Sequence, residues 1–290
     1  MTAVRKPVVA GQFYGGSRQQ CLEEIAECMP AEPVGIELPE TIVAAIVPHA
    51  GWVFSGALAA TAFAAIRQVN GDVDTFIVFG AAHGYAGNAP AVYDSGAWET
   101  PLGEIEIDGR LAEQIIKLGA KADITAHRYE HSIEVQVPFI QHLFPQAQLV
   151  PAIVPVNGFK ADFCRGLGEF LDSQDRRVVC VASTDLTHYG PRYGFCPHGT
   201  GPASLRWAGQ INDKAFIDLA VSMQAEKLLE ESLRAGNACG PAAAATVVAT
   251  AAARGKKQGI LLGHTTSSEV MMEKFQRHSD ESVGYAAIVY

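Results

Sequence analysis

The sequence predicts a single α/β domain over residues 1–290, with a mixed, mostly parallel central sheet flanked by helices. Short β-branched and apolar runs alternate with helical patterns from end to end, as in other α/β proteins. No linker, internal repeat or low-complexity tract divides the chain. A length of 290 residues with 48% hydrophobic content is also enough to bury one large core.

The expected strands are β-branched or apolar runs that end at Gly, Pro or polar residues. In chain order they cover 41–47, 74–79, 89–93, 104–107, 149–154, 178–182, 259–262 and 283–289. The segment 98–103, between two of these strands, is expected to be a loop. The first two strands flank a helical segment, and this order predicts a parallel pair with a right-handed crossover.

The expected helices are segments whose apolar residues recur at helical spacing. They cover 17–27, about 55–69, 108–118, 132–144, 159–172, 204–219, 225–235 and 241–254. Ser17 and Asp108 are candidate N-caps for two of them. Pro138 is expected to kink or shorten its helix, whereas Pro241 suits a first helical turn.

Three of the expected strands run into a histidine. His49, His83 and His188 each follow the carboxyl end of a strand, within a segment rich in Gly, Pro or Asp. Ligands bind at this edge in open α/β sheets, and neighbouring strands lie only ~4.8 Å apart. Taken singly, each imidazole is explained equally well as a polar loop residue. Together they predict that imidazoles from separate segments converge on one site.

Asp185 and His188 form the densest polar cluster after a strand. Their spacing places both side chains on one side of a turn, where Asp185 can orient an imidazole that acts as a general base or acid. Ser183, Thr184 and Asp185 are also good helix N-caps, and both roles can hold at once.

Cys239 lies near the expected start of the last helix. Free N–H groups and the helix dipole stabilise a thiolate there, and such positions lower a cysteine pKa to roughly 3.5–7.5. The alternative is a small buried side chain packed among alanines. Glu130, His131 and Glu134 surround Ser132 at another expected helix start, where they either face a cleft or only cap and solubilise the helix.

The composition excludes several classes of partner. A net charge of −9 and a pI near 5.5, without a cluster of Lys and Arg, argue against binding to nucleic acid. The apolar segment 238–253 falls short of the ~20 residues that cross a bilayer, and no signal peptide begins the chain. The six scattered cysteines are typical of reduced thiols, so we expect a cytoplasmic protein that does not bind membranes.

In these segments the chain resembles the Memo family, the protein B component of AmmeMemoRadiSam gene groups. The matching motifs are Ala10-Gly-Gln-Phe-Tyr14, Pro48-His-Ala-Gly-Trp-Val-Phe-Ser-Gly56, Phe79-Gly-Ala-Ala-His83, Thr100-Pro-Leu-Gly103, Glu130-His-Ser-Ile-Glu134, Ser183-Thr-Asp-Leu-Thr-His188 and Ala238-Cys-Gly-Pro241. They span nearly the whole chain, and Trp52 in the second motif is a further candidate cleft residue.

The resemblance implies a fold similar to class III extradiol dioxygenases. It also implies a metal held by His49, His83 and Cys239, with Asp185 and His188 beside it as the acid/base pair. Partner proteins of the AMMECR and radical-SAM types follow from the same resemblance. The chain departs from many relatives around His83, where Ala81, Ala82 and Gly84 replace polar residues and make the surroundings drier.

Three functions fit these residues. The first is a metal-dependent redox enzyme, of dioxygenase or oxidase type, that acts on a small substrate at a two-His, one-Cys site with iron or copper. The second is a hydrolase in which zinc activates water and Asp185 or His188 is the base. The third is a non-catalytic module that binds a peptide or protein, which the link of eukaryotic Memo proteins to phosphotyrosine signalling allows. Cys239 stands where dioxygenases have a carboxylate, so the fold alone does not imply their chemistry.

Overall fold

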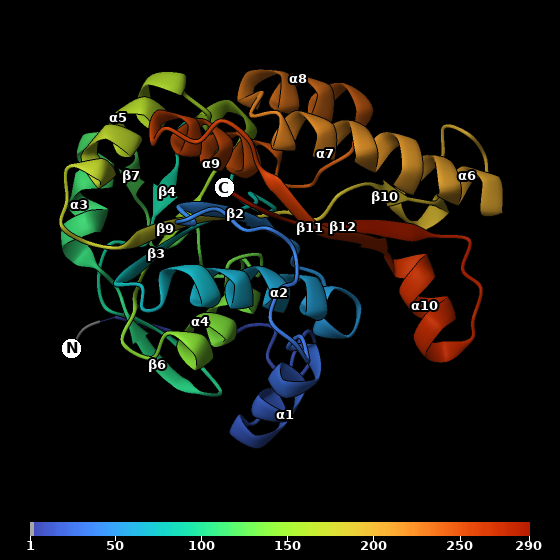
Figure 1. Cartoon of the computed structure of the whole chain (residues 1–290), viewed down its shortest axis with the longest axis horizontal. Helices are drawn as coiled ribbons and strands as arrows, with labels where there is room; N and C mark the ends of the chain where they lie inside the picture. Colours follow the sequence, from blue (N-terminus) through green and yellow to red (C-terminus); the bar gives the residue numbers. More distant parts are fainter. Residues whose placement is uncertain (1–2) are drawn as a thin grey trace.

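The computed structural model describes residues 3–290 and is built around a nine-stranded mixed sheet (Figure 1). In spatial order the strands are β10 (His188–Tyr189), β12 (Ser282–Val289), β2 (Ala44–Val47), β9 (Val178–Ser183), β3 (Thr75–Gly80), β8 (Gln148–Ile153), β4 (Ala91–Val92) and β7 (Lys121–Ala122), with β11 (Ile260–Thr266) paired to β12. The central strands β2, β9, β3 and β8 are parallel, and antiparallel pairs lie on both sides of them. The predicted α/β class with a mixed sheet is confirmed.

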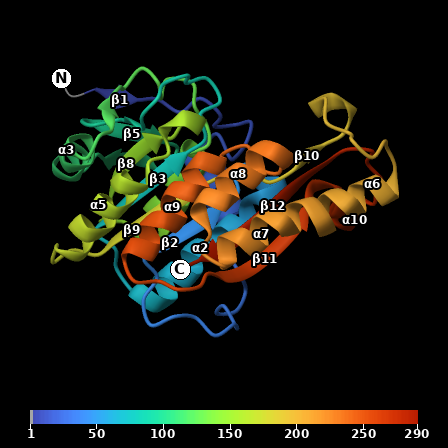
Figure 2. The same cartoon turned by 90° about the horizontal axis from the view of Figure 1, so that it is seen from above.

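Helices cover both faces of this sheet. They are α1 (Arg18–Cys28), α2 (Trp52–Asn70), α3 (Gly109–Lys117), α4 (Val137–Leu143), α5 (Ala161–Asp172), α6 (Pro202–Trp207), α7 (Asp213–Val221), α8 (Ala225–Ala235), α9 (Pro241–Ala253) and α10 (Ser267–Phe275). In Figure 1, α5, α8 and α9 lie above the sheet, and α2 and α4 lie below it. Figure 2 shows α7, α8 and α9 crossing the upper face.

The alternation of side chains along the strands explains the two layers. Ile46 and Ile77 belong to the buried cluster that includes α9, whereas the adjacent Val47 and Val78 belong to the cluster that includes α2. Successive residues of a strand point to opposite faces, so a strand covered on both faces must be apolar throughout. The unbroken β-branched runs in the sequence follow from this requirement.

Several predicted elements have the expected ends. Ser17 caps α1 through a capping box with Gln20, and the Asp108 carboxylate accepts a hydrogen bond from the Leu111 N–H at the start of α3. Pro138 lies in the first turn of α4, after a 3-10 turn over Glu134–Gln136, so the helix expected over 132–144 is shortened. The helix expected over 204–219 is divided into α6 and α7 by a π-helical turn over Ala208–Asn212.

One expectation was wrong, and one was confirmed in orientation only. The segment 98–103 is not a loop: β5 (Ala97–Thr100) pairs with β6 (Gly103–Glu106) and β1 (Val4–Arg5) in a separate three-stranded sheet. Trp98 is buried within this sheet, and a loop over the same segment would not bury its side chain. The two strands β2 and β3 are parallel but are not neighbours, because β9 lies between them.

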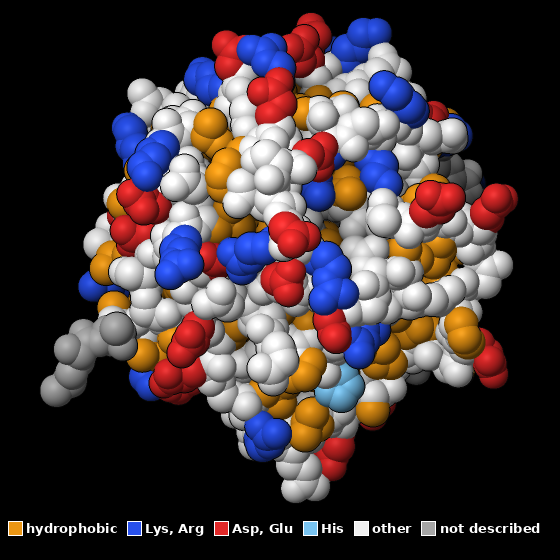
Figure 3. Space-filling view, turned by 60° about the vertical axis from the view of Figure 1, so that its left-hand side comes forward, with side chains coloured by type: hydrophobic (Ala, Val, Ile, Leu, Met, Phe, Trp, Pro, Cys, Tyr) orange, Lys and Arg blue, Asp and Glu red, His pale blue; other side chains and the backbone are white. Residues whose placement is uncertain are grey.

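Helix α2 is long and apolar enough, by length and composition alone, to cross a membrane. Half of its most apolar window is buried inside the fold, where Ala60, Phe63 and Ile66 are fully buried. The core therefore accounts for its apolar composition. On the face drawn in Figure 3, basic and acidic side chains are interspersed, so this face has no broad area of one sign.

Candidate metal centre

The candidate site lies at the carboxyl ends of three adjacent parallel strands. His49 follows β2, His83 follows β3, and Asp185 follows β9, which lies between the two. His131 comes from the loop before α4, and it can approach because Gly80 has no Cβ: one added there would lie 2.6 Å from side-chain atoms of Ser132 and Ile133. His49 and His83 therefore lie together at this sheet edge, joined by His131, while His188 lines the same cavity outside this cluster.

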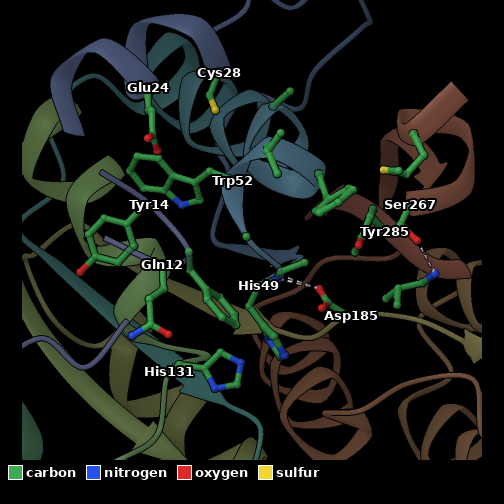
Figure 4. A pocket seen from close by; sticks show the side chains of 18 of the residues that line it. Gln12, Tyr14, Glu24, Cys28, His49, Trp52, His131, Asp185, Ser267 and Tyr285 are labelled. Carbon is green, nitrogen blue, oxygen red and sulfur yellow. Dashed lines mark hydrogen bonds between the residues drawn. The ribbon is translucent and has the colours of Figure 1, made fainter. Parts of the chain in front are cut away.

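Three imidazoles form a cluster whose spacing would allow them to hold a metal ion. Among residues 3–290, the ligand atoms of His49, His83 and His131 all lie within 4.8 Å of one another. The ring centroids are 5.3 Å apart for His49 and His83, and 4.8 Å apart for His83 and His131, whose rings stack. Figure 4 shows His49 and His131 side by side at one end of a cavity of about 890 Å³. Imidazole nitrogens at such separations can share one ion.

A hydroxyl group sets the tautomer of His49. The Ser183 hydroxyl donates its only hydrogen to the Ser132 carbonyl, 2.6 Å away, and accepts one from the Gln136 amide at 2.9 Å. Its contact with His49 Nδ1 at 3.2 Å must therefore be a second acceptance, which assigns the proton to Nδ1. The lone pair of His49 Nε2 is then free for a metal.

A carboxylate sets the tautomer of His83. Glu130 Oε1 lies 3.0 Å from His83 Nδ1, and Glu130 Oε2 accepts the His83 backbone N–H at 3.0 Å. Although burial alone raises the pKa of the Glu130 carboxyl, the bonds from His83 and the Ser132 N–H lower it to about 2. The same bond raises the pKa of His83. Glu130 is buried behind the imidazole and supports a ligand rather than lining the cleft.

His188 is oriented by a backbone carbonyl and not by Asp185. Its Nδ1 lies 3.0 Å from the Leu186 oxygen, which can only accept, so Nε2 is the unprotonated nitrogen. Asp185 Oδ1 instead accepts the His49 N–H at 2.6 Å and the Ala50 N–H at 3.2 Å (Figure 4). No helix begins at 183–185, so these residues are not caps. Asp185 holds the turn that carries His49.

Burial keeps two of the imidazoles neutral. It lowers the pKa of His49 to about 3, with a further contribution from the nearby His83. Burial, followed by His49 and His83, lowers the pKa of His131 to about 4. A metal ion needs neutral imidazole ligands, and these two are available without the loss of a proton near neutral pH.

Cys239 lies beside the histidines but is not the activated thiolate that its sequence position predicts. Its Sγ is 3.2 Å from His49 Nε2 and accepts the Asp185 N–H at 3.3 Å. Burial raises the pKa of the thiol, and the Asp185 carboxylate raises it further. Helix α9 starts only at Pro241, and the Gly240 N–H donates to Thr184 Oγ1, so this N–H does not stabilise the sulfur.

Glu134 does not reach the cavity, whereas Trp52 lines it. Glu134 is buried away from the cavity and accepts hydrogen bonds from Arg5, Tyr14 and the backbone of Val8. It therefore holds the N-terminal segment in place. Trp52 does line the cavity, but it is largely buried and packs on Tyr14 and Phe139 while its indole donates to a backbone carbonyl.

Sequence reasoning missed three contributors to the site. Ser183 was considered only as a cap, and Gln136, which binds both Ser183 and the Pro48 carbonyl, was not considered. Phe13 contacts the edge of His131, with ring centroids 5.0 Å apart, and lines the cavity. Phe13 and Ser183 carried a signal, because both lie in segments with the family resemblance, Ala10–Tyr14 and Ser183–His188.

Comparison with known proteins agrees with that resemblance. Residues 5–289 match the family model described as Memo-like protein. The chain is 38% identical to a MEMO1 family protein of Thermococcus onnurineus and 36% identical to one of Pyrococcus abyssi, each over 99% of both chains. It is 33% identical to a MEMO1 family protein of Methanopyrus kandleri over 99% of this chain and 98% of that protein. This full-length similarity, together with the three-histidine cluster, shows that the chain belongs to the Memo-like protein family.

Proposed function

We propose that this protein is a metal-dependent redox enzyme that acts on a small substrate in the large cavity. His49 and His83 would hold the ion, with Cys239 as the third ligand and His131 as its competitor for that position. The observation that carries the proposal is the fixed orientation of the imidazoles. His49, His83 and His188 each have Nδ1 beside an acceptor, which leaves Nε2 free to bind a metal or a proton.

The donor set fits a redox metal. Imidazoles suit iron, copper and zinc, and a thiolate favours softer ions such as copper(I). An iron or copper ion at this position would supply electron transfer to or from a bound substrate. The raised pKa of Cys239 means that its proton must leave when the sulfur binds an ion.

The residues around the ion have separate tasks. His188 lines the cavity with an unprotonated Nε2 and would accept a proton from the substrate. Asp185 and Ser183 hold His49 by its backbone and its ring, respectively. Phe13 and Tyr285 line the same cavity, where they exclude water and offer apolar contact to the substrate.

Metal analysis of the purified protein tests the proposal. Protein prepared anaerobically without chelators should contain about one iron or copper ion per chain, which His49→Ala and His83→Ala should remove. His278→Ala is the matched control, because His278 is exposed and outside the cavity. The metal contents of Cys239→Ser and His131→Ala are then compared. The substitution that removes more metal identifies the third ligand.

The outcomes separate the candidate functions. Oxygen consumption or electron transfer by the loaded protein supports the redox enzyme. Activity with zinc that is indifferent to oxygen would point to hydrolysis. If no metal binds even when it is added, both enzymatic functions fail, and a peptide-binding module remains. Association with AMMECR-type or radical-SAM proteins is a separate proposal, which co-purification tests.

A further inference from the structure

A second cavity of about 260 Å³ reaches the candidate centre from another side. It shares no lining residue with the large cavity, and Cys239 lines only the second one. Cys239 is partly exposed, whereas His49 is almost fully buried. Of these two residues of the candidate centre, Cys239 is therefore the one at the second cavity.

Only one layer of side chains separates the two cavities. Cys239 Sγ lies 3.2 Å from His49 Nε2, and His49 lines the large cavity. Ala82 lines the second cavity while its neighbour His83 lines the first. An ion held by His49, His83 and Cys239 would stand in this wall and could be approached from both sides.

Small residues on both sides of His83 explain why the space is open. Ala82, Ala86 and Gly87 line the second cavity, and none of them has a side chain large enough to fill it. Gly240 lets the chain at Cys239 pack closely, since an added Cβ would lie 3.1 Å from the Ala81 side chain and the Ser183 carbonyl.

The lining also limits what can enter. It contains no Asp, Glu, Lys, Arg or His residue, and its polar side chains are those of Tyr85, Asn157 and Cys239. A surface without charges does not compensate the desolvation of an ion, so it favours small uncharged molecules over anions and cations. The large cavity differs, because Glu24, Asp185 and Lys274 are among its lining residues.

We propose that the second cavity is a separate entrance to Cys239, which admits a small uncharged reactant while the large cavity holds the substrate. The use of this entrance in catalysis rests on the proposed metal centre, but its existence does not. Two reagents could then approach one ion from opposite sides without competing for the same space.

Thiol labelling of the full-length, metal-free protein tests the entrance. Methyl methanethiosulfonate is a small uncharged reagent, and peptide mass spectrometry gives the labelling rate of each cysteine. Cys239 reports on the second cavity, Cys28 on the large one that it lines, and the exposed Cys196 on reagent activity. Val156→Trp places an indole at an exposed position beside the second cavity. Ala57→Trp is the matched control, an exposed residue that lines the large cavity beside Gly56, the neighbour of Cys28.

We expect Val156→Trp to slow the labelling of Cys239 by about tenfold, because the reagent must then wait for a local opening of the structure. The rates of Cys28 and Cys196 should not change, and Ala57→Trp should slow only Cys28. Ala86→Trp, a second exposed substitution in the cavity wall, should repeat the effect if Val156→Trp does not fold. The entrance is refuted if Ala57→Trp slows Cys239 while Val156→Trp does not, or if Cys239 is labelled at the same rate in the wild type, Val156→Trp and Ala86→Trp. Neither result depends on metal, so the proposed function is judged separately.

Discussion

Replacing Glu130 by Gln tests whether the support behind His83 sets the affinity for metal. The Glu130 carboxylate accepts three hydrogen bonds, from the His83 backbone N–H, the His83 ring and the Ser132 N–H. A glutamine amide has a single oxygen, which can accept two of them at most. The third donor then stays unpaired. If this donor is the His83 ring, its proton can instead move from Nδ1 to Nε2.

The size of the effect follows from these contacts. The pKa of Glu130 lies at about 2 in place of 4.5, which corresponds to about 3 kcal/mol in favour of the ionised group. A neutral side chain loses most of this stabilisation of the ionised group. A buried donor left unpaired costs about 1–3 kcal/mol. Loss of a partner behind a histidine ligand typically lowers metal affinity by about 10- to 100-fold.

Titration against a chromophoric chelator measures the affinity, and urea unfolding of the metal-free protein measures the stability. Glu113→Gln is the matched control, because Glu113 pairs with Lys117 on the exposed surface of α3. The reasoning is refuted if Glu130→Gln binds metal within twofold of the wild type. An equal loss in both variants would show that the substitution acts through overall charge and not through His83.

Three further predictions follow from other contacts. Ser183→Ala should lower metal affinity by about tenfold, because the His49 ring loses the acceptor at Nδ1, and the same chelator titration measures it. Glu134→Gln should lower the free energy of unfolding by about 3–5 kcal/mol, since it leaves the buried Arg5 charge without its partner at 2.8 Å. The control Glu99→Gln, at an exposed pair with Lys6, should lower the free energy of unfolding by under about 1 kcal/mol. Burial lowers the pKa of His127 from 6.5 to about 4, so the unfolded chain binds the proton more readily and stability falls as the pH drops from about 6.5 to 4. This loss should approach about 3 kcal/mol, and urea unfolding of His127→Phe at several pH values should show a smaller slope.

The sequence was sufficient to predict the sheet and its edge. Runs such as Thr75–Gly80 are buried on both faces and therefore apolar almost throughout, which is a local property that pattern reading detects. Ser17 and Asp108 cap α1 and α3 because capping acts over three residues. β5 was missed although its partner β6 follows directly in the chain, and its pairing with β1 joins residues far apart, which no local pattern predicts.

The candidate site was predicted less completely, for the same physical reason. The position of His49 and His83 depends on strands, but the orientation of each ring depends on acceptors from other segments. Ser183 lies 134 residues from His49, and Glu130 lies 47 residues from His83. No local pattern records such pairs. Cys239 shows the converse, because its position before α9 predicted a thiolate while the surrounding packing raises the pKa of the thiol.

The acceptors behind His49 and His83 also differ in strength, so the two imidazoles differ in their strength as ligands. A carboxylate behind His83 raises its pKa and makes its Nε2 the more basic donor, whereas a hydroxyl behind the buried His49 leaves the pKa of that ring at about 3. When the pH falls, a proton therefore competes with a bound ion at His83 before it does so at His49. Of the two imidazoles, His83, which lines the large cavity, would therefore release the ion first.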